Sequence, residues 1–413
     1  MHLQTSTYAD PAGLAIHGVG REPYFSYFLR TFTCGPGDGW CSSRKPFRSL
    51  GSDPECYHES LGTHTRPTMR EETMKRLLTI AILFGGLLLP ACGDPHQQAR
   101  EAHERGDHVA ALREWQSLAD DGDHEAQYQL GSLYAAGNGV EQDYEQAATW
   151  LRRAADGDHI AAQMDLARLY ISGKGVGPDL GEAARWFRAA AEQGDPKAQL
   201  AIGDMHFRGL GVSRDPAIVV SWFEKAAAQG ETAANLQLGD MYAKGLGVER
   251  DNVKAAEWYL QAAQRGSAAA QFFYGAMLHE GRGVEQSYTE ASKWYLKSAA
   301  EGFARAQFNL GTLYFDGKGV QQDDAEAARL YRLAAEQGHV KAQHSLGSMR
   351  ATGRGTERDL VEAYMWFSLA SDQGNKSAFV GLGLVSERMT EEEIEQGRAR
   401  AQDWLPVDQR VSE

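Results

Sequence analysis

The sequence predicts an all-α protein, a solenoid in which pairs of helices stack along the chain. A Gly-x-Gly pair recurs seven times at intervals of 36 residues, beginning with Gly137 and Gly139. Ala126 begins a series of alanines with the same interval, and Trp150 begins a series of tryptophans in which Leu330 replaces one member. Because one two-helix unit cannot bury its apolar face alone, a fixed period of this length is typical of stacked repeats.

A short apolar run predicts a secretory signal peptide over residues 74–91. Lys75 and Arg76 precede 13 uncharged residues, 77–89. A membrane-spanning helix needs about 20 apolar residues, whereas a basic segment followed by roughly 7–15 apolar residues is typical of an export signal. A buried apolar helix and an uncleaved signal-anchor are the alternatives. Because export signals begin a chain, we expect residues 1–73, which show no periodicity, to be a disordered, over-extended gene start.

The end of this run resembles the lipobox of bacterial lipoproteins, which here reads Leu89-Pro90-Ala91-Cys92. The resemblance implies that Cys92 is lipidated and becomes the mature N-terminus, with residues 92–98 as a tether. The other three cysteines precede Cys92, so the repeats are expected to fold without disulfides.

Each repeat divides into two predicted helices. In the first helix of repeat one, Ala126, Leu130 and Leu133 lie on one helical face. Gly131 lies in mid-helix, where glycine costs about 1 kcal/mol relative to alanine. Because a small residue recurs at this position in every repeat, we expect a neighbouring helix to approach closely there. The Gly-x-Gly pair, beginning at Gly137, then ends the helix by allowing positive φ.

The second helix begins at an aspartate or serine N-cap, which is Asp143 in repeat one. In five of the seven repeats a Glu or Gln follows three positions later, as Gln146 does, and predicts a capping box. Residues 99–125 are expected to form an irregular opening helix pair. Residues 378–413 are expected to form a C-terminal capping helix, which begins at Thr390, and a tail.

The segment from Ala126 to Trp150 spells the pattern of Sel1-like repeats, which are relatives of the tetratricopeptide repeat. The resemblance places seven repeats over residues 126–377 and implies a right-handed α/α superhelix. It also implies a scaffold or adaptor that binds other macromolecules without chemistry of its own. One subfamily, once described as β-lactamase-like, carries two cysteines in each repeat; this chain has none there. A lipidated cysteine followed by such repeats is also similar to the lipoprotein scaffold of alginate export.

Charge and motifs exclude several functions. The formal charge of −14 argues against nucleic-acid binding, which requires clustered Lys and Arg. Neither a His-Glu-x-x-His metal motif nor a Gly-x-Ser-x-Gly nucleophile elbow occurs. The Gly-Lys-Gly segments lack the rest of a phosphate-binding loop. We therefore expect no cofactor, no metal and no enzymatic activity.

Partner binding is expected where the repeats differ, on their first helices. Nine positions after the first alanine, large aromatic side chains break a trend of small residues and, with Phe273, could form an aromatic stripe in a concave groove; irregular packing is the alternative. Two positions after that alanine, where Tyr128 lies, the residues are mostly apolar, and inter-repeat core is the alternative. Aromatic anchors in a groove are typical of interface recognition. The predicted partner-binding residues are Tyr128, Phe207, Phe273, His279 and Phe315. Acidic residues nearby predict a negative groove that would favour a basic or neutral partner; these are Asp165, Asp204, Asp240, Glu280 and Asp316.

Together these observations predict a lipid-anchored, periplasm-facing scaffold that binds proteins of the bacterial cell envelope. Gly93, rather than aspartate, follows the lipidated cysteine, which favours the outer membrane. A module that binds peptidoglycan or an exported polysaccharide is the second hypothesis, and a β-lactamase-like enzyme is the third.

Overall fold

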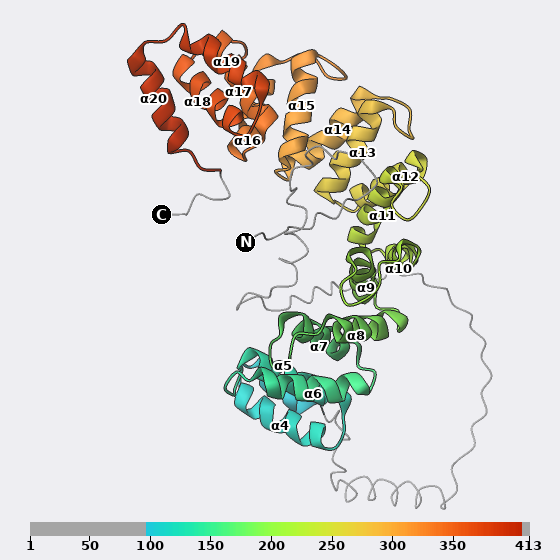
Figure 1. The fold of residues 1–413 in the computed structure, drawn as a ribbon. Helices are drawn as coiled ribbons and strands as arrows, with labels where there is room; N and C mark the ends of the chain where they lie inside the picture. Colours follow the sequence, from blue (N-terminus) through green and yellow to red (C-terminus); the bar gives the residue numbers. More distant parts are fainter. Residues whose placement is uncertain (1–95, 407–413) are drawn as a thin grey trace, which may run out of the picture. The chain divides into compact units, whose positions relative to one another are not determined.

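The computed structural model describes residues 96–406, and this part of the chain is built from 18 helices without a strand (Figure 1). The expected signal peptide and Cys92 lie outside the described residues. The opening helices are α3 (Gln97–Glu104) and α4 (His108–Asp120), and the closing helices are α19 (Lys376–Ser386) and α20 (Glu391–Gln402). No helix between residues 96 and 406 is long and apolar enough to cross a membrane.

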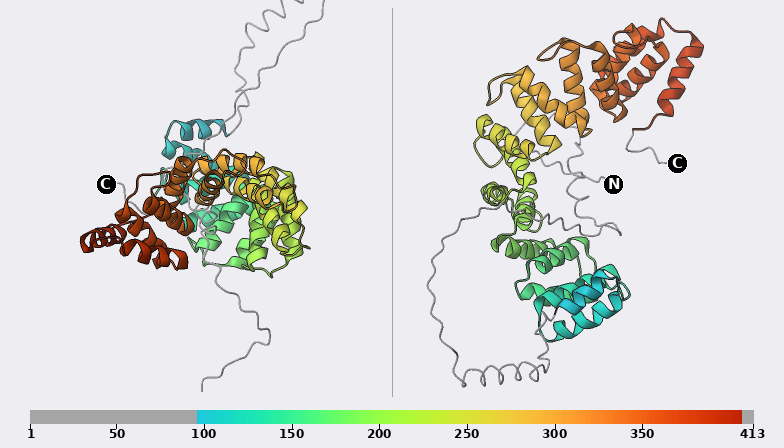
Figure 2. Two further views of the ribbon diagram at one scale, coloured as in Figure 1. Left: turned by 90° about the horizontal axis from the view of Figure 1, so that it is seen from above. Right: turned by 180° about the vertical axis from the view of Figure 1, so that it is seen from behind.

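Between these ends lie seven helix pairs, and each of the fourteen helices has 13 residues. The first helices are α5 (His124–Ala136), α7 (Ile160–Ser172), α9 (Pro196–Arg208), α11 (Thr232–Lys244), α13 (Ala268–Glu280), α15 (Ala304–Asp316) and α17 (Val340–Thr352). The second helices are α6 (Tyr144–Asp156), α8 (Leu180–Glu192), α10 (Pro216–Ala228), α12 (Asn252–Gln264), α14 (Tyr288–Ala300), α16 (Asp324–Glu336) and α18 (Leu360–Asp372). Each first helix packs on its own second helix and on the second helix before it, so the pairs follow one another in chain order (Figure 2). This arrangement confirms the predicted all-α solenoid.

A bulky side chain on each second helix explains the small residue in the middle of each first helix. A Cβ atom added to Gly203 would lie 2.6 Å from Cε1 of Phe223, and one added to Gly239 would lie 2.6 Å from Cε1 of Tyr259. Repeat two has Ala167 at this position, and its side chain is fully buried. The expected close approach of neighbouring helices is therefore confirmed.

The two glycines of each Gly-x-Gly turn differ in what they contact. The first ends the helix in the left-handed conformation, as Gly209 does with a φ of 72°. The second has positive φ too, but it also touches the preceding repeat: a Cβ atom on Gly211 would lie 2.1 Å from the carbonyl oxygen of Leu180. In repeat one, Gly139 makes the same contact with His108, the first residue of α4. The irregular opening pair is thus in register with the repeats through α4.

The predicted N-caps of the second helices are confirmed, whereas the predicted capping boxes in the repeats are wrong. The Asp143 side chain accepts from the backbone N–H groups of Glu145 and Gln146. The backbone N–H of Asp143, however, donates to the carbonyl oxygen of Tyr134 at 3.0 Å. In a capping box the Glu or Gln side chain three positions later would accept a hydrogen bond from this N–H. Here the carbonyl oxygen of the first helix accepts it instead. Such a glutamate instead pairs with a basic residue, as Glu326 does with Arg329 three positions further on.

Buried glutamines join consecutive repeats. In repeat two, Gln163 donates to the carbonyl oxygen of Ala155 at 3.1 Å, and its own oxygen accepts from Gln193 at 2.8 Å. Three other repeats have both bonds, centred on Gln199, Gln307 and Gln343. A buried amide that bonds to the helix on either side ties three helices together without leaving a polar atom unpaired.

The C-terminal end contains two helices where the sequence analysis expected one. Asn375 caps α19 by accepting from the N–H of Ala378, as the first helix of a further repeat would be capped. The predicted cap of α20 is confirmed, with reciprocal bonds between Thr390 and Glu393. However, α20 packs on α18 rather than on α19 (Figure 1).

Candidate partner-binding ridge

The first helices share a partly exposed ridge, because packing buries only two of their sides. In α5 the buried residues include Ala126, Leu130 and Leu133. Tyr128 and Ser132 lie on the remaining side and stay half-buried. We call the ridge the set of positions two, three, six, nine and ten after the first buried alanine in each first helix. All five predicted partner-binding residues belong to the ridge, but they lie on four helices: α5, α9, α13 and α15.

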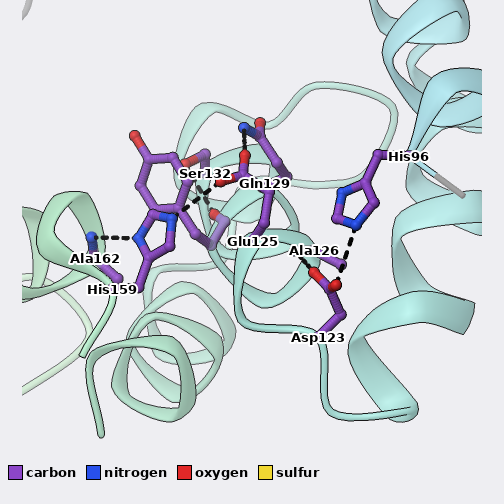
Figure 3. A network of polar contacts seen from close by, with 9 residues as sticks. His96, Asp123, Glu125, Ala126, Gln129, Ser132, His159 and Ala162 are labelled. Atoms are coloured by element: carbon purple, nitrogen blue, oxygen red, sulfur yellow. Dashed lines mark hydrogen bonds and ion pairs between the residues drawn. The ribbon is translucent and has the colours of Figure 1, made fainter. Parts of the chain in front are cut away.

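Tyr128 belongs to a polar network between repeats one and two. Its ring stacks on His159 with the centroids 4.7 Å apart. His159 caps α7, because its Nδ1 atom accepts from the N–H of Ala162; its Nε2 atom therefore carries the proton and donates to Glu125 at 3.1 Å. Figure 3 shows His159 and Gln129 converging on Glu125. Burial raises the pKa of Tyr128 to about 12, and the bond from His159 lowers the pKa of Glu125 to about 2.

Phe273 lies in an aromatic cluster that joins repeats four and five and reaches the N-cap of α15. Its ring stacks on Tyr259 at 5.2 Å and meets Phe272 edge-on at 5.3 Å. Phe272 is buried and also contacts Tyr295 and Phe303. Phe273 and Phe303 keep part of their surfaces exposed. The buried rings therefore hold these two in place, as a preformed binding surface requires.

Phe303 was missed by the sequence analysis. It occupies the N-cap position of α15 and makes no side-chain capping bond. In other repeats Asp123, His159, Asp195 or Ser267 accepts a hydrogen bond there. Giving up such a bond costs about 1 kcal/mol. The signal that could have found Phe303 was an aromatic side chain at a register where the other repeats have capping or polar residues.

His279 and Phe315 pack more within the chain than the sequence suggested. The His279 ring lies 5.1 Å from Tyr288, and its buried Nδ1 atom has no hydrogen-bond partner among the described residues. Burial lowers the pKa of His279 and so favours the neutral ring. The Arg354 guanidinium lies 3.7 Å from the centroid of Phe315 and is held there by two 2.8 Å bonds to Asp324. One face of Phe315 is therefore already covered by repeat seven.

Phe207 is half-buried on α9. Its carbonyl oxygen accepts from Arg214, but no other aromatic ring lies against its side chain in residues 96–406. Phe315 likewise has no ring against it in this part of the chain, but Arg354 covers one of its faces, whereas no cation lies over the ring of Phe207.

The five carboxylates of the predicted negative groove are all paired, because each has a basic partner nearby in sequence. Asp204 pairs with Arg208 at 2.9 Å, and Asp240 pairs with Lys244 at 2.5 Å. The other pairs are Asp165 with Arg168, Glu280 with Arg282, and Asp316 with Lys318. Each pair places a positive charge beside a ridge carboxylate and so reduces the negative charge of the ridge locally.

His339 predicts a pH dependence of stability. It caps α17 through Nδ1, which accepts from the N–H of Ala342 and must be unprotonated to do so. Burial, with Arg305 and Lys341 nearby, lowers the pKa of His339 from 6.5 to about 4. Its stabilising contribution is therefore complete above about pH 6.5 and is lost as the pH falls toward 4, by roughly 3 kcal/mol at most.

We expect His339→Asn to reduce this loss, since Asn375 caps α19 without a titratable group. Urea unfolding at pH 7 and pH 4.5 would measure the difference. An equal loss of stability in the variant and the parent would show that other groups cause the acid sensitivity.

The fold and the ridge define a helical-repeat solenoid with a partly apolar side. The sequence matches the Sel1 repeat family over seven consecutive segments that together span residues 124–375, namely 124–159, 160–195, 196–231, 232–267, 268–303, 304–339 and 340–375. The chain belongs to the Sel1 repeat family, whose members are generally non-catalytic and mediate protein–protein interaction. Residues 96–406 contain no group of three His, Cys, Asp or Glu side chains that could hold a metal ion.

Two solved structures are similar to this chain, and the first of them agrees with this assignment. A Sel1 repeat protein from Oxalobacter formigenes is 33% identical, with 72% of this chain and 92% of that chain covered and a TM-score of 0.57. A protective antigen of uropathogenic Escherichia coli that displays the same repeat fold is 28% identical, with 82% and 94% covered and a TM-score of 0.46. No curated protein matches the sequence.

Proposed function

We propose that this chain is a non-catalytic, lipid-anchored scaffold of the bacterial cell envelope that binds partner proteins through its first-helix ridge. The observation that carries the proposal is a partly exposed aromatic surface over buried rings, formed by the ridge residue Phe273 and by Phe303, which lies beside the ridge at the N-cap of α15. Phe303 stands where a capping residue would stabilise α15. A residue that breaks a local stability rule favours a functional role at that position.

The ion pairs along the ridge support a partner recognised by apolar contact rather than by net charge. Each carboxylate already has a cation beside it, as Asp204 has Arg208. A basic partner would therefore have to compete with an existing pair. We expect partner binding to depend only weakly on salt, since exposed charges contribute little once they are paired.

We expect Phe207→Ala to weaken partner capture at least several-fold while leaving helicity unchanged, because the ring is half-exposed and engages no other ring. Proximity labelling in the native organism, followed by mass spectrometry, would measure capture. The matched control is Leu296→Ala, which removes an apolar side chain that is 55% exposed on a second helix, away from the ridge. If both variants lose the same partners, the ridge is not the binding surface. In a separate assay, retention of the chain on purified sacculi in the absence of other proteins would favour the glycan-binding hypothesis instead.

The anchoring part of the proposal rests on the apolar run 77–89 and the lipobox-like segment that ends in Cys92. We expect Cys92→Ala to release the protein from membranes, because the thiol is the site of lipid attachment in lipoproteins that share this motif. Fractionation of native cells would show the variant in the soluble fraction. Cys92→Ala that stays in the membrane fraction would favour an uncleaved signal-anchor. Separation of inner and outer membranes would test the outer-membrane location favoured by Gly93.

A further inference from the structure

The helix α19 follows the last repeat and occupies the place of a further first helix. Its exposed face is unusually apolar. Phe379 is 69% exposed, Val380 is 60% exposed and Leu384 is 55% exposed. At helical spacing these residues share a face with Lys376 and Glu387, which are also exposed. The three apolar residues lie within two turns, so they form one patch rather than scattered contacts.

This face is uncovered because α19 lacks the second helix that covers every preceding first helix. Gly383 lies at the register where glycines in other repeats meet a ring of the second helix, such as Gly203 against Phe223 at 2.6 Å. A Cβ atom on Gly383 would meet nothing within 4 Å. The glycine thus leaves an open hollow on α19.

The helix that follows cannot fill this hollow. In the second helices of the repeats, the residue eight positions after the N-cap is the one that packs on the small residue of the first helix, for example Phe223 or Leu151. In α20 the residue at this position is Arg398. Gly397 instead lets α20 approach Tyr364 of α18, where an added Cβ atom would lie 2.8 Å from the ring. Among residues 96–406, therefore, no other helix covers the exposed face of α19.

We propose that this face binds the same face of a second copy, with the two α19 helices antiparallel across a two-fold axis. Phe379 and Gly383 are four residues apart on this face. A two-fold axis that crosses the face midway between them places each Phe379 ring over Gly383 of the second copy. The same axis places Lys376 near Glu387 of the second copy. Among residues 96–406 neither Lys376 nor Glu387 forms an ion pair, so both charges are available. A two-fold contact requires such self-complementarity.

The opposite end of the solenoid argues against a head-to-tail contact. The exposed residues of α3 are polar or charged, for example Gln97, Arg100 and Glu101. Val109 of α4, which is 55% exposed, is the one exposed large apolar side chain in α3 and α4, so this end has no apolar patch to match that of α19. The contact is therefore isologous and closes at two copies instead of extending into a filament. One short helix from each copy buries less than the roughly 1,200 Å² of a standard interface, so the dimer is weak and reversible.

Sedimentation velocity of the full chain in mild detergent tests the proposal across a concentration range from about 1 to 300 µM, which suits a weak interface. We expect a monomer–dimer equilibrium that Phe379→Glu weakens at least tenfold while helicity stays constant. The matched control is Leu296→Glu, which places the same charge on an apolar side chain that is 55% exposed elsewhere. A parent that stays monomeric throughout this range, or a dimer that Phe379→Glu leaves intact, overturns the proposal.

A charge exchange distinguishes the proposed geometry from general stickiness. Lys376→Glu and Glu387→Lys should each weaken the dimer, because each places like charges opposite one another across the axis. The double variant should restore association toward the parent level, since every pair is then again of opposite sign. Single variants that weaken association without recovery in the double variant would overturn the antiparallel register.

Discussion

Replacing Gly283 with alanine is expected to destabilise the chain by roughly 3–5 kcal/mol, combining left-handed strain with an overpacked contact. The backbone of Gly283 has a φ of 71°, and its added Cβ atom would lie 2.1 Å from the carbonyl oxygen of Asn252. Asn252 is the first residue of the preceding second helix, so relief requires two repeats to separate. Because contacts in a solenoid are local, hydrogen exchange in repeats four and five should accelerate most.

Gly266→Ala is the matched control for Gly283→Ala. Gly266 also has positive φ, 92°, but an added Cβ atom would meet nothing within 4 Å. We therefore expect only the backbone strain, roughly 1–2 kcal/mol. Urea unfolding followed by circular dichroism would compare the two variants. Equal losses would show that the contact between repeats contributes nothing and that positive φ alone explains the glycine.

Phe223→Ala is expected to cost roughly 3–5 kcal/mol, the range for removing a large buried side chain. The Phe223 ring is 2% exposed and lies against Gly203 in the opposite helix. Because glycine offers no side chain that could collapse into the space, the cavity should remain largely open. Loss of protection from hydrogen exchange in α9 and α10 would locate the damage.

The contrast with Phe379→Ala makes the prediction for Phe223 specific. Phe379 is 69% exposed, so its truncation should change stability by no more than about 0.5 kcal/mol. The same substitution is thus expected to reduce stability strongly on one helix and hardly at all on another helix of the same solenoid. A loss of only about 1 kcal/mol in Phe223→Ala would show that α9 and α10 can close the cavity.

Local features of the repeat could be predicted from the sequence because their causes lie within a few residues. Asp143 caps its helix by bonding to the next two backbone N–H groups, and the φ of Gly209 depends on its own missing Cβ. The ridge residues could also be predicted, since helical period determines which side of a first helix lies away from its neighbours. Phe303 was missed because an aromatic side chain at an N-cap has no local rationale.

Contacts over longer separations could not be predicted in the same way. Arg354 covers Phe315 although they are 39 residues apart in sequence. The backbone N–H of Asp143 bonds to Tyr134, which removes the need for a capping box. Arginines and lysines near the ridge carboxylates were visible in the sequence. Their pairing depends on which rotamers the packed helices allow.

The sequence by itself determined the repeat, its period, the two helices of each unit and the side of each helix that is buried. These follow from the positions of apolar residues, caps and glycines, which act over one or two helical turns. Only the tertiary structure decided what each open position meets. Gly203 receives the ring of Phe223, whereas Gly383 at the same register receives nothing, because α20 packs on α18. The position of α20 depends on the relative free energies of packing it on α18 and on α19. These involve contacts between residues far apart in sequence.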